Sequence, residues 1–219
     1  MIASPRLNRL PAAERGITIG DFLVPVSLGE RISTRARNLA MIIAGALFIA
    51  LTAQFVILRQ PVPITGQTLG VLLVGGALGS KRGALATLVY VVLGFFLPVY
   101  AEHAHGIERI IGISSGQIVL GATGGYLIGF IAAAAIVGRL AELGWDRNVL
   151  GAIAMFTVGN LVIYAFGVPW LMAATGLDLP GAIAAGVTPF LVIDTLKILI
   201  AAALFPGAWW LVGRRPPER

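Results

Sequence analysis

The sequence contains no cysteine and few charged residues for its length. Cysteine is absent from all 219 positions, which excludes disulfides, thiolate metal sites and a cysteine nucleophile. Only 12% of the residues are charged and 58% are apolar, whereas a typical globular domain is about 25% charged and about half apolar. A soluble protein of this composition could not cover its surface with polar groups. The composition therefore predicts an all-α integral membrane protein.

Six apolar runs follow one another along the chain. We expect each run to form a transmembrane helix, because about 20 helical residues cross a hydrocarbon core of about 30 Å. The second and third runs are shorter than this, so they must tilt, thin the bilayer or lie beside a cavity. The runs cover residues 39–58, 65–78, 84–97, 118–140, 149–168 and 190–212.

Basic residues are distributed unevenly between these runs. If the N-terminus is cytoplasmic, 13 of the 16 basic residues lie in cytoplasmic segments, whereas only Arg59 and Arg109 lie outside and Lys197 lies in the last run. The positive-inside rule therefore predicts six transmembrane helices with both termini in the cytoplasm. The net charge of +6 reflects these flanks rather than nucleic-acid binding. We expect an N-terminal cytoplasmic extension over residues 1–37, a transmembrane domain over 38–213 and a cytoplasmic tail over 214–219.

Two oppositely charged residues lie within the last apolar run. Asp194 and Lys197 are three positions apart, so they share one face of a helix. A charge at the bilayer centre costs at least about 2.5–3.5 kcal/mol on insertion scales. The pair either neutralises itself as a structural element or anchors a polar ligand that enters from the outer side. Because intramembrane ionisable residues are usually functional, we favour the ligand anchor.

Two other segments and one polar residue could contribute to such a ligand site. The glycine-rich segment 121–126, at the outer start of the fourth run, permits either close approach of a polar group or tight helix packing. The proline-rich segment 61–68 could cap a helix or line the cavity. Asn160, in the fifth run, needs a hydrogen-bond partner from a ligand or a neighbouring helix. Beside the charged pair, the expected ligand contacts are Gln67, Tyr90, Thr123, Gly124, Gly125, Tyr126 and Asn160.

The first run carries small residues at a spacing of four. Alanines at this spacing make a flat ridge for close helix–helix approach, either within the protein or with a partner. The residues are Ala40, Ala44, Ala46 and Ala50.

The longest interior loop, residues 98–117, contains both histidines. His103 and His105 have Glu102 and Glu108 nearby, but two histidines in an exposed loop are usually solvated, so we expect no metal site. The chain has no phosphate-binding loop, no H-E-x-x-H and no G-x-S-x-G motif. We therefore expect neither an enzyme nor a nucleotide site.

Three segments resemble, in order, the BioY family, the biotin-binding S components of energy-coupling factor (ECF) vitamin transporters. They are PVPITGQTLGVLLVGGALGSKRGALATLVYVVLGFFLPVY, GATGGYLIGF and VPWLMAATGLDLPGAIAAGVTPFLVIDTLKILIAAAL. The resemblance covers about residues 40–212. It implies a six-helix S-component-like bundle in the bacterial cytoplasmic (inner) membrane, which captures biotin from outside with high affinity. It also implies two kinds of partner: a transmembrane coupling protein, and ATPase subunits that alone hydrolyse ATP, so this chain needs no cofactor.

The same resemblance suggests roles for particular residues. It makes Asp194 and Lys197 ligand contacts, the segment 121–126 a pocket wall, and the alanine ridge the docking surface for the coupling protein. The sequence departs from the family pattern at Ala122, where the family has proline, and in its longer, more charged loop. Other hypotheses therefore stay open: an S component for another vitamin or a biotin precursor, a stand-alone proton-coupled carrier that uses Asp194, and a membrane enzyme.

Overall fold

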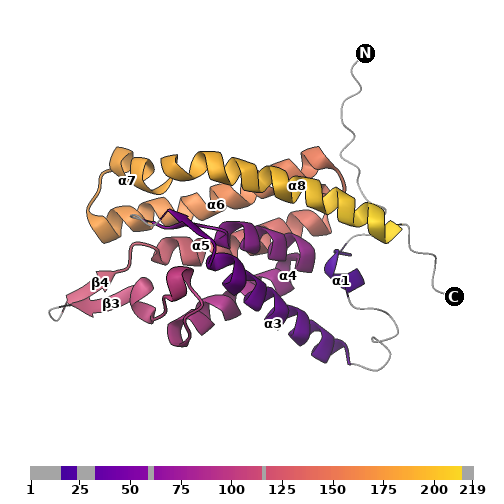
Figure 1. Ribbon diagram of the computed structural model, residues 1–219, viewed down its shortest axis with the longest axis horizontal. Helices are drawn as coiled ribbons and strands as arrows, with labels where there is room; N and C mark the ends of the chain where they lie inside the picture. The colour runs from indigo at the N-terminus through magenta and orange to yellow at the C-terminus, as the bar shows by residue number, and fades with distance from the viewer. Residues whose placement is uncertain (1–15, 24–32, 59–61, 115–116, 214–219) are drawn as a thin grey trace, which may run out of the picture.

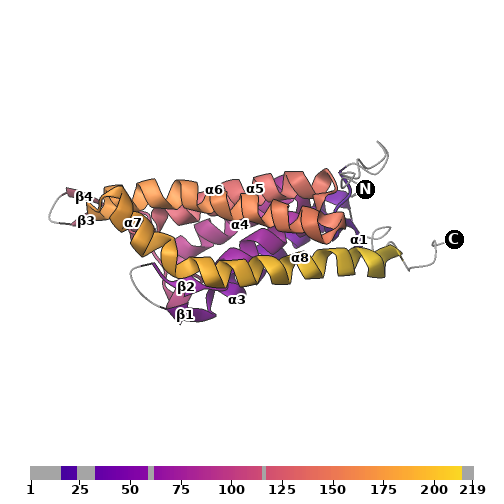
Figure 2. The same ribbon diagram turned by 90° about the horizontal axis from the view of Figure 1, so that it is seen from above.

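The protein is a bundle of long helices, with short hairpins at one end (Figures 1 and 2). The structure, a computed structural model, describes residues 16–23, 33–58, 62–114 and 117–213. Within these residues, five helical stretches are long and apolar enough to cross a membrane. They contain the helices α3 (Thr34–Ala53), α4 (Gln67–Phe96), α5 (Gly124–Glu142), α6 (Val149–Thr175) and α8 (Leu191–Gly213).

Helix α4 is folded back on itself and supplies two crossings. Gly79 has φ 82° and ψ 176°, a conformation that is essentially restricted to glycine. The chain after this bend runs back alongside the chain before it. Gln67 Nε2, in the first arm, donates a hydrogen bond of 2.6 Å to the hydroxyl of Tyr90, in the second arm. A Cβ atom on Gly83 would lie 2.8 Å from the Cα atom of Gly75. The arms correspond to the second and third predicted spans, so the six-helix, all-α membrane architecture agrees with the prediction.

The described chain begins and ends at the same end of the bundle. There, the ring of Phe22 packs against that of Trp209 with centroids 5.7 Å apart, and Ser80, after the bend in α4, donates a backbone hydrogen bond of 2.8 Å to Glu142. Figures 1 and 2 show α1 (Gly20–Leu23) and the last turn of α8 at this end. An even number of crossings requires this arrangement. That this end faces the cytoplasm remains a prediction of the positive-inside rule.

The opposite end contains elements that the sequence analysis did not predict. The expected spans 39–58 and 118–140 were wrong at one end each, because their β-branched residues pair as strands instead of continuing the helices. Two antiparallel hairpins result, with Val56 opposite Thr65 and Ile111 opposite Leu120. The strands are β1 (Val56–Leu58), β2 (Ile64–Thr65), β3 (Ile111–Ser114) and β4 (Gln117–Leu120).

A short helix, α7 (Leu179–Gly186), also lies at this end and precedes α8. The side chain of Asp178 caps it by accepting a hydrogen bond of 2.9 Å from the backbone of Gly181, and a proline stands in its first turn. Aspartate at the cap followed by proline is a typical helix start, so this helix could have been predicted from the sequence.

The core lies between the two arms of α4, α5 and α6, whereas α3 and α8 present large apolar side chains outward. Fully buried side chains include Tyr90, Leu72, Phe156 and Ile163. The outward faces fit a lipid environment, because a soluble monomer rarely exposes so much contiguous apolar surface. Exposed residues on these two helices include Leu39, Leu47, Leu51, Leu196, Leu199 and Leu204.

Candidate functional site

Asp194 and Lys197 form a buried ion pair in the half of α8 nearest the hairpin end. The two residues are 2% and 7% exposed, and Lys197 Nζ lies 2.8 Å from Asp194 Oδ1. Lys197 also donates a hydrogen bond of 2.8 Å to the hydroxyl of Thr68, at the start of α4. Burying two charges is costly unless their remaining polar atoms are satisfied. The pair therefore connects α8 to α4 through charged hydrogen bonds.

The other oxygen of Asp194 is held by α6. The Tyr164 hydroxyl donates a hydrogen bond of 2.7 Å to Oδ2, and Asn160 Nδ2 donates one of 3.2 Å to the same atom. Asn160 and Tyr164 are four residues apart and so share one helix face. Tyr164 was not among the ligand contacts expected from the sequence; its spacing from Asn160 was the signal that could have linked the two. Both carboxylate oxygens are therefore fixed, Oδ1 by Lys197 of the same helix and Oδ2 by two residues of α6.

A small cavity of about 40 Å³ lies beside Lys197. Four predicted site residues meet around it: Gln67, Thr123, Tyr126 and Lys197. The apolar part of its wall comes from Val62, Leu127, Phe130 and Phe190. The cavity thus combines amide, hydroxyl and ammonium groups with aliphatic and aromatic surface.

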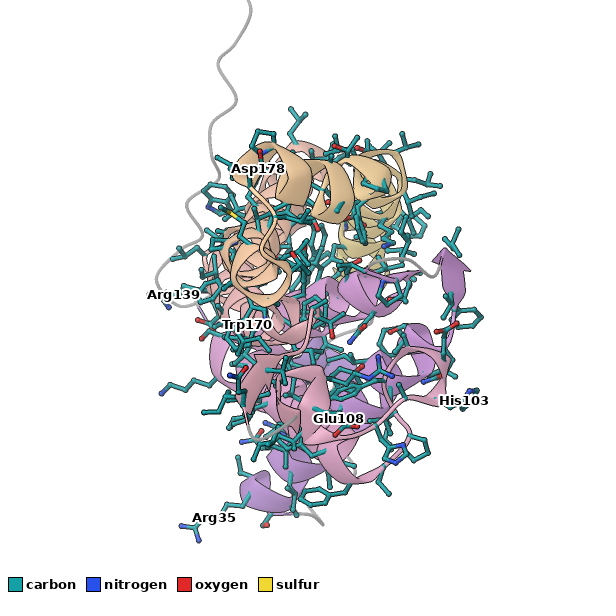
Figure 3. All side chains as sticks on the ribbon, turned by 90° about the vertical axis from the view of Figure 1, so that its left-hand side faces the viewer. Arg35, His103, Glu108, Arg139, Trp170 and Asp178 are labelled. Carbon is teal, nitrogen blue, oxygen red and sulfur yellow. The ribbon has the colours of Figure 1, made fainter. Side chains whose placement is uncertain are left out.

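A larger vestibule of about 290 Å³ adjoins this cavity toward the hairpin end. The two share part of their walls, namely Pro63, Gln67, Thr123 and Leu127. Three charged residues line the vestibule, Glu102, Glu108 and Arg109, and Figure 3 shows Glu108 at this end of the molecule. A polar molecule entering from this end would meet charged groups first and Lys197 last.

Two predicted residues lie behind the cavity wall rather than on it. The hydroxyl of Tyr90 is fully buried and accepts the hydrogen bond from Gln67. Asn160 lies behind Asp194, and both line a separate cleft of about 240 Å³ between α6 and α8. Within the described residues, Asn160 Oδ1 is buried without a hydrogen-bond partner. Tyr90 and Asn160 are thus placed to orient Gln67 and Asp194.

The glycines of segment 121–126 pack against Trp170. A Cβ atom on Gly124 would lie 2.8 Å from the Trp170 ring, and one on Gly125 would clash with the same side chain. The indole Nε1 donates a hydrogen bond of 2.9 Å to the Gly121 carbonyl, and the Tyr126 hydroxyl donates one of 2.9 Å to the Gly186 carbonyl. These contacts connect the start of α5 to α6 and α7, so the two glycines position the wall that Thr123 and Tyr126 form.

Comparison with known proteins decides the family. A sequence profile of the BioY family matches residues 26–214. The chain belongs to the BioY family. Its relatives include the biotin transporter BioY of Thermotoga maritima, 37% identical over 66% of this chain and 79% of the relative. Another is the biotin transporter BioY of Rhizobium etli, 33% identical over 75% of this chain and 85% of the relative.

A solved structure shows the same fold as this BioY family member. It is the crystal structure of the S-component for biotin from an ECF-type ABC transporter, with a TM-score of 0.70 and 20% sequence identity. The match covers 84% of this chain and 96% of that one. Family and fold together make this chain a multi-pass membrane protein of a transporter family.

The four alanines of α3 do not share one surface in this BioY family member. Ala40 and Ala44 are exposed, Ala46 is buried against the bundle and Ala50 is half-buried. The first pair therefore faces outward, whereas the second pair serves mainly the packing of α3 against α4.

The two histidines are exposed. Figure 3 shows His103 projecting from the side of the molecule. Among the described residues, no group of three or more histidine, aspartate or glutamate side chains is arranged to hold a metal ion.

Proposed function

We propose that this protein captures biotin outside the cell as the substrate-binding component of an ECF-type transporter. The observation that carries the proposal is the buried Lys197, whose ammonium lines the inner cavity while Asp194 and Thr68 hold it in place. Curated relatives of this chain are named biotin transporters, which supports biotin as the ligand.

Biotin has groups that match the lining of the two cavities. Its ureido ring offers two N–H donors and a carbonyl acceptor, its valerate tail ends in a carboxylate, and its thiophane ring is apolar. Lys197 can donate to a carbonyl or a carboxylate, and Gln67 can both donate and accept. Leu127 and Phe130 provide apolar contact surface.

The sizes of the cavities define how such a ligand would fit. A cavity of about 40 Å³ has room for roughly one water molecule, whereas sites for small molecules usually measure about 300–1,000 Å³. The body of the ligand would therefore occupy the vestibule of about 290 Å³, with one polar end reaching Lys197. Glu102 and Arg109 would lie beside the exposed part of the ligand.

Release into the cell would require partner proteins. A transmembrane coupling protein would dock on α3 at Ala40 and Ala44, which are exposed small residues suited to close helix packing. ATP would be hydrolysed by ATPase subunits bound to that protein, so the chain itself would be a binding component without catalytic activity or cofactor.

Competition binding tests the ligand assignment directly. Radiolabelled biotin is bound to the purified protein in detergent and displaced with unlabelled biotin, dethiobiotin or thiamine. We expect biotin to displace best, dethiobiotin more weakly because it lacks the thiophane ring, and thiamine not at all. Equal displacement by thiamine, or stronger displacement by dethiobiotin, would reject biotin as the preferred ligand.

A further inference from the structure

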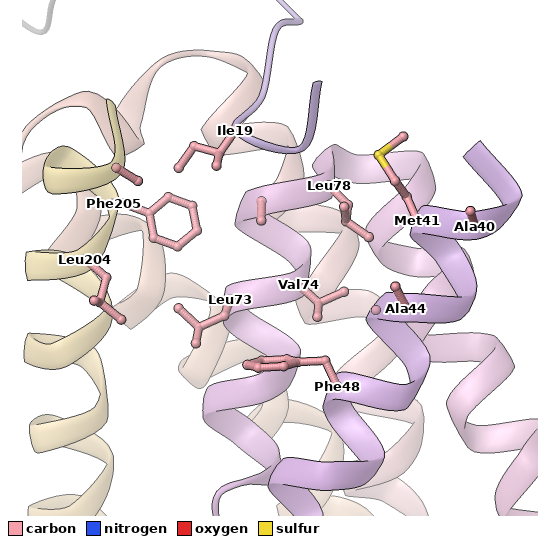
Figure 4. A pocket seen from close by; sticks show the side chains of 13 residues that line it. Ile19, Ala40, Met41, Ala44, Phe48, Leu73, Val74, Leu78, Leu204 and Phe205 are labelled. Carbon is pink, nitrogen blue, oxygen red and sulfur yellow. The ribbon is translucent and has the colours of Figure 1, made fainter. Parts of the chain in front are cut away.

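An apolar groove of about 570 Å³ lies on the side of the bundle, between α3, the first arm of α4 and α8 (Figure 4). All 13 lining residues are apolar or glycine, and Ile19 of the N-terminal segment closes one end. The groove shares no lining residue with the cavity beside Lys197. It is therefore a second site, which the ligand pathway does not use. Its walls include Ala40, Ala44, Phe48, Leu73, Leu204 and Phe205.

The length of the groove matches one leaflet of a bilayer. Its wall on α3 runs from Ala40 to Phe48, which is about 12 Å along the helix axis. Half of a typical hydrocarbon core is about 15 Å. The groove also lies toward the end of the bundle that contains Ile19 and Ala208, which the positive-inside rule assigns to the cytoplasm.

A cationic side chain with unused hydrogen-bonding capacity lies at that end. Arg37 precedes Met41 by one helical turn and so shares the face of α3 that lines the groove. Its Nε atom is buried and has no hydrogen-bond partner among the described residues. Asp21, on the N-terminal segment, is already paired with Arg82 at 2.7 Å.

We propose that this groove binds one anionic phospholipid, with an acyl chain between α3 and α8 and the phosphate on Arg37. Lipid tails are as apolar as leucine, so burial alone does not select a lipid. The guanidinium of Arg37 would select an anionic lipid, because a guanidinium binds phosphate through paired N–H donors. Basic pockets between transmembrane helices on the cytoplasmic side are known to hold anionic headgroups. Because Ala40 and Ala44 line the groove, the lipid leaves when a partner helix docks there.

Native mass spectrometry of the purified protein tests this proposal without biotin. The probes are a phosphatidylglycerol with one palmitoyl and one oleoyl chain, and the phosphatidylcholine with the same chains. One surface arginine contributes about 1 kcal/mol to binding of anionic lipid, so the wild type should bind the first lipid about fivefold more tightly. Arg37→Gln should abolish this preference. Arg35→Gln is the matched control and should retain it, because Arg35 is exposed and points away from the bundle (Figure 3).

A second pair of variants tests the acyl-chain groove. Ala44→Trp fills the groove and should weaken both lipids at least tenfold, whereas Leu47→Trp, on an exposed position outside the groove, should leave both unchanged. A cooperative thermal transition in detergent at the wild-type melting temperature shows that a variant is folded. If Ala44→Trp fails that check, the comparison of the two arginine variants decides the test. Equal affinity of the wild type for the two lipids, or equal effects of the two arginine variants, would overturn the proposal. Unchanged lipid binding by folded Ala44→Trp would also overturn it.

Discussion

The hydroxyl of Tyr164 donates a hydrogen bond of 2.7 Å to Oδ2 of Asp194, while Lys197 holds the other oxygen at 2.8 Å. The carboxylate is therefore fixed between α6 and α8 before any ligand arrives. A ligand that contacts Lys197 meets an ammonium whose position depends on this arrangement, so residues behind the cavity can influence affinity.

Removing the Tyr164 hydroxyl tests this dependence. Among the described residues, Tyr164→Phe leaves Asn160 as the remaining hydrogen-bond partner of Oδ2, and a hydrogen bond to a charged group contributes about 1.5–3 kcal/mol. We expect a lower melting temperature in detergent and biotin affinity reduced about tenfold, although Tyr164 does not line the ligand cavity.

Tyr126→Phe is the matched control for stability. It removes a hydroxyl whose acceptor is the uncharged carbonyl of Gly186, so the expected loss of stability is only about 0.5–1.5 kcal/mol. If Tyr126→Phe lowered the melting temperature more than Tyr164→Phe does, the charged hydrogen bond would not have the importance that we assign to it.

The bend in α4 should depend on glycine at position 79. Gly79→Ala places a side chain on a backbone with φ 82°, and its Cβ atom would lie 2.9 Å from the Glu142 carboxylate. Such a conformation costs about 1–3 kcal/mol for other residues. We expect a lower melting temperature, measured by fluorescence in detergent.

Gly207→Ala provides the comparison for that variant. Gly207 lies in α8, and a Cβ atom added there would have open space around it; alanine favours helix over glycine by up to about 1 kcal/mol. Its melting temperature should stay the same or rise. A Gly79→Ala protein as stable as Gly207→Ala would contradict the assignment of two arms joined by a glycine bend.

The buried carboxyl group of Asp146 should make the stability of the folded protein depend on pH in an unusual way. This residue lies between α5 and α6, is fully buried, and accepts a hydrogen bond of 2.7 Å from Trp209. Burial raises its pKa to about 6, although Trp209 and Arg147 act in the opposite direction. Because the folded pKa is above the unfolded value of 3.8, the folded state binds an extra proton between these pH values. Stability should therefore fall as the pH rises toward about 6 and stay lower above it.

Asp146→Asn should remove this fall while keeping an acceptor for Trp209. The shift of the Asp146 pKa by about two units corresponds to a loss of folding stability of roughly 3 kcal/mol at most above pH 6. We therefore expect the variant to melt at a higher temperature than the wild type at pH 7.5 and at a similar temperature at pH 4. The measurement is the melting temperature across this pH range. A variant that melts lower than the wild type at pH 7.5 would show that the charged form of Asp146 stabilises the fold.

Asp21→Asn is a control of opposite sign. Burial acts to raise the pKa of Asp21, but hydrogen bonds from Arg82 and Thr18 outweigh it and hold the pKa below its usual value. A depressed pKa gives stability that is present above the unfolded value of 3.8 and is lost as the pH falls below it. Asp21→Asn should therefore destabilise the protein at pH 7.5, where Asp146→Asn stabilises it.

Features that depend on neighbours in sequence could be predicted, and contacts between distant residues could not. The pairing of Asp194 with Lys197 follows from their spacing on one helix, and the six crossings follow from apolar runs and basic turns. Nothing local indicated that Thr68 would accept from Lys197 across 129 positions, because this contact depends on how α4 packs against α8.

The boundaries of the helices were harder to predict for a different reason. Residues 118–120 are as apolar as the helix that follows, so hydropathy could not separate strand β4 from α5. The alanines of α3 likewise have one spacing but two environments: Ala44 is exposed and Ala46 is buried. Only packing distinguishes a docking surface from an internal contact.

Equilibrium binding of biotin to the purified protein, with and without the buried pair, tests the account most directly. We predict tight binding by the wild type and at least a tenfold loss, about 1.4 kcal/mol, in both Asp194→Asn and Lys197→Ala. Lys81→Ala and Asp178→Asn change the same groups at exposed positions and should bind like the wild type. Failure of folded wild-type protein to bind biotin, or wild-type affinity in both variants of the pair, would contradict the account.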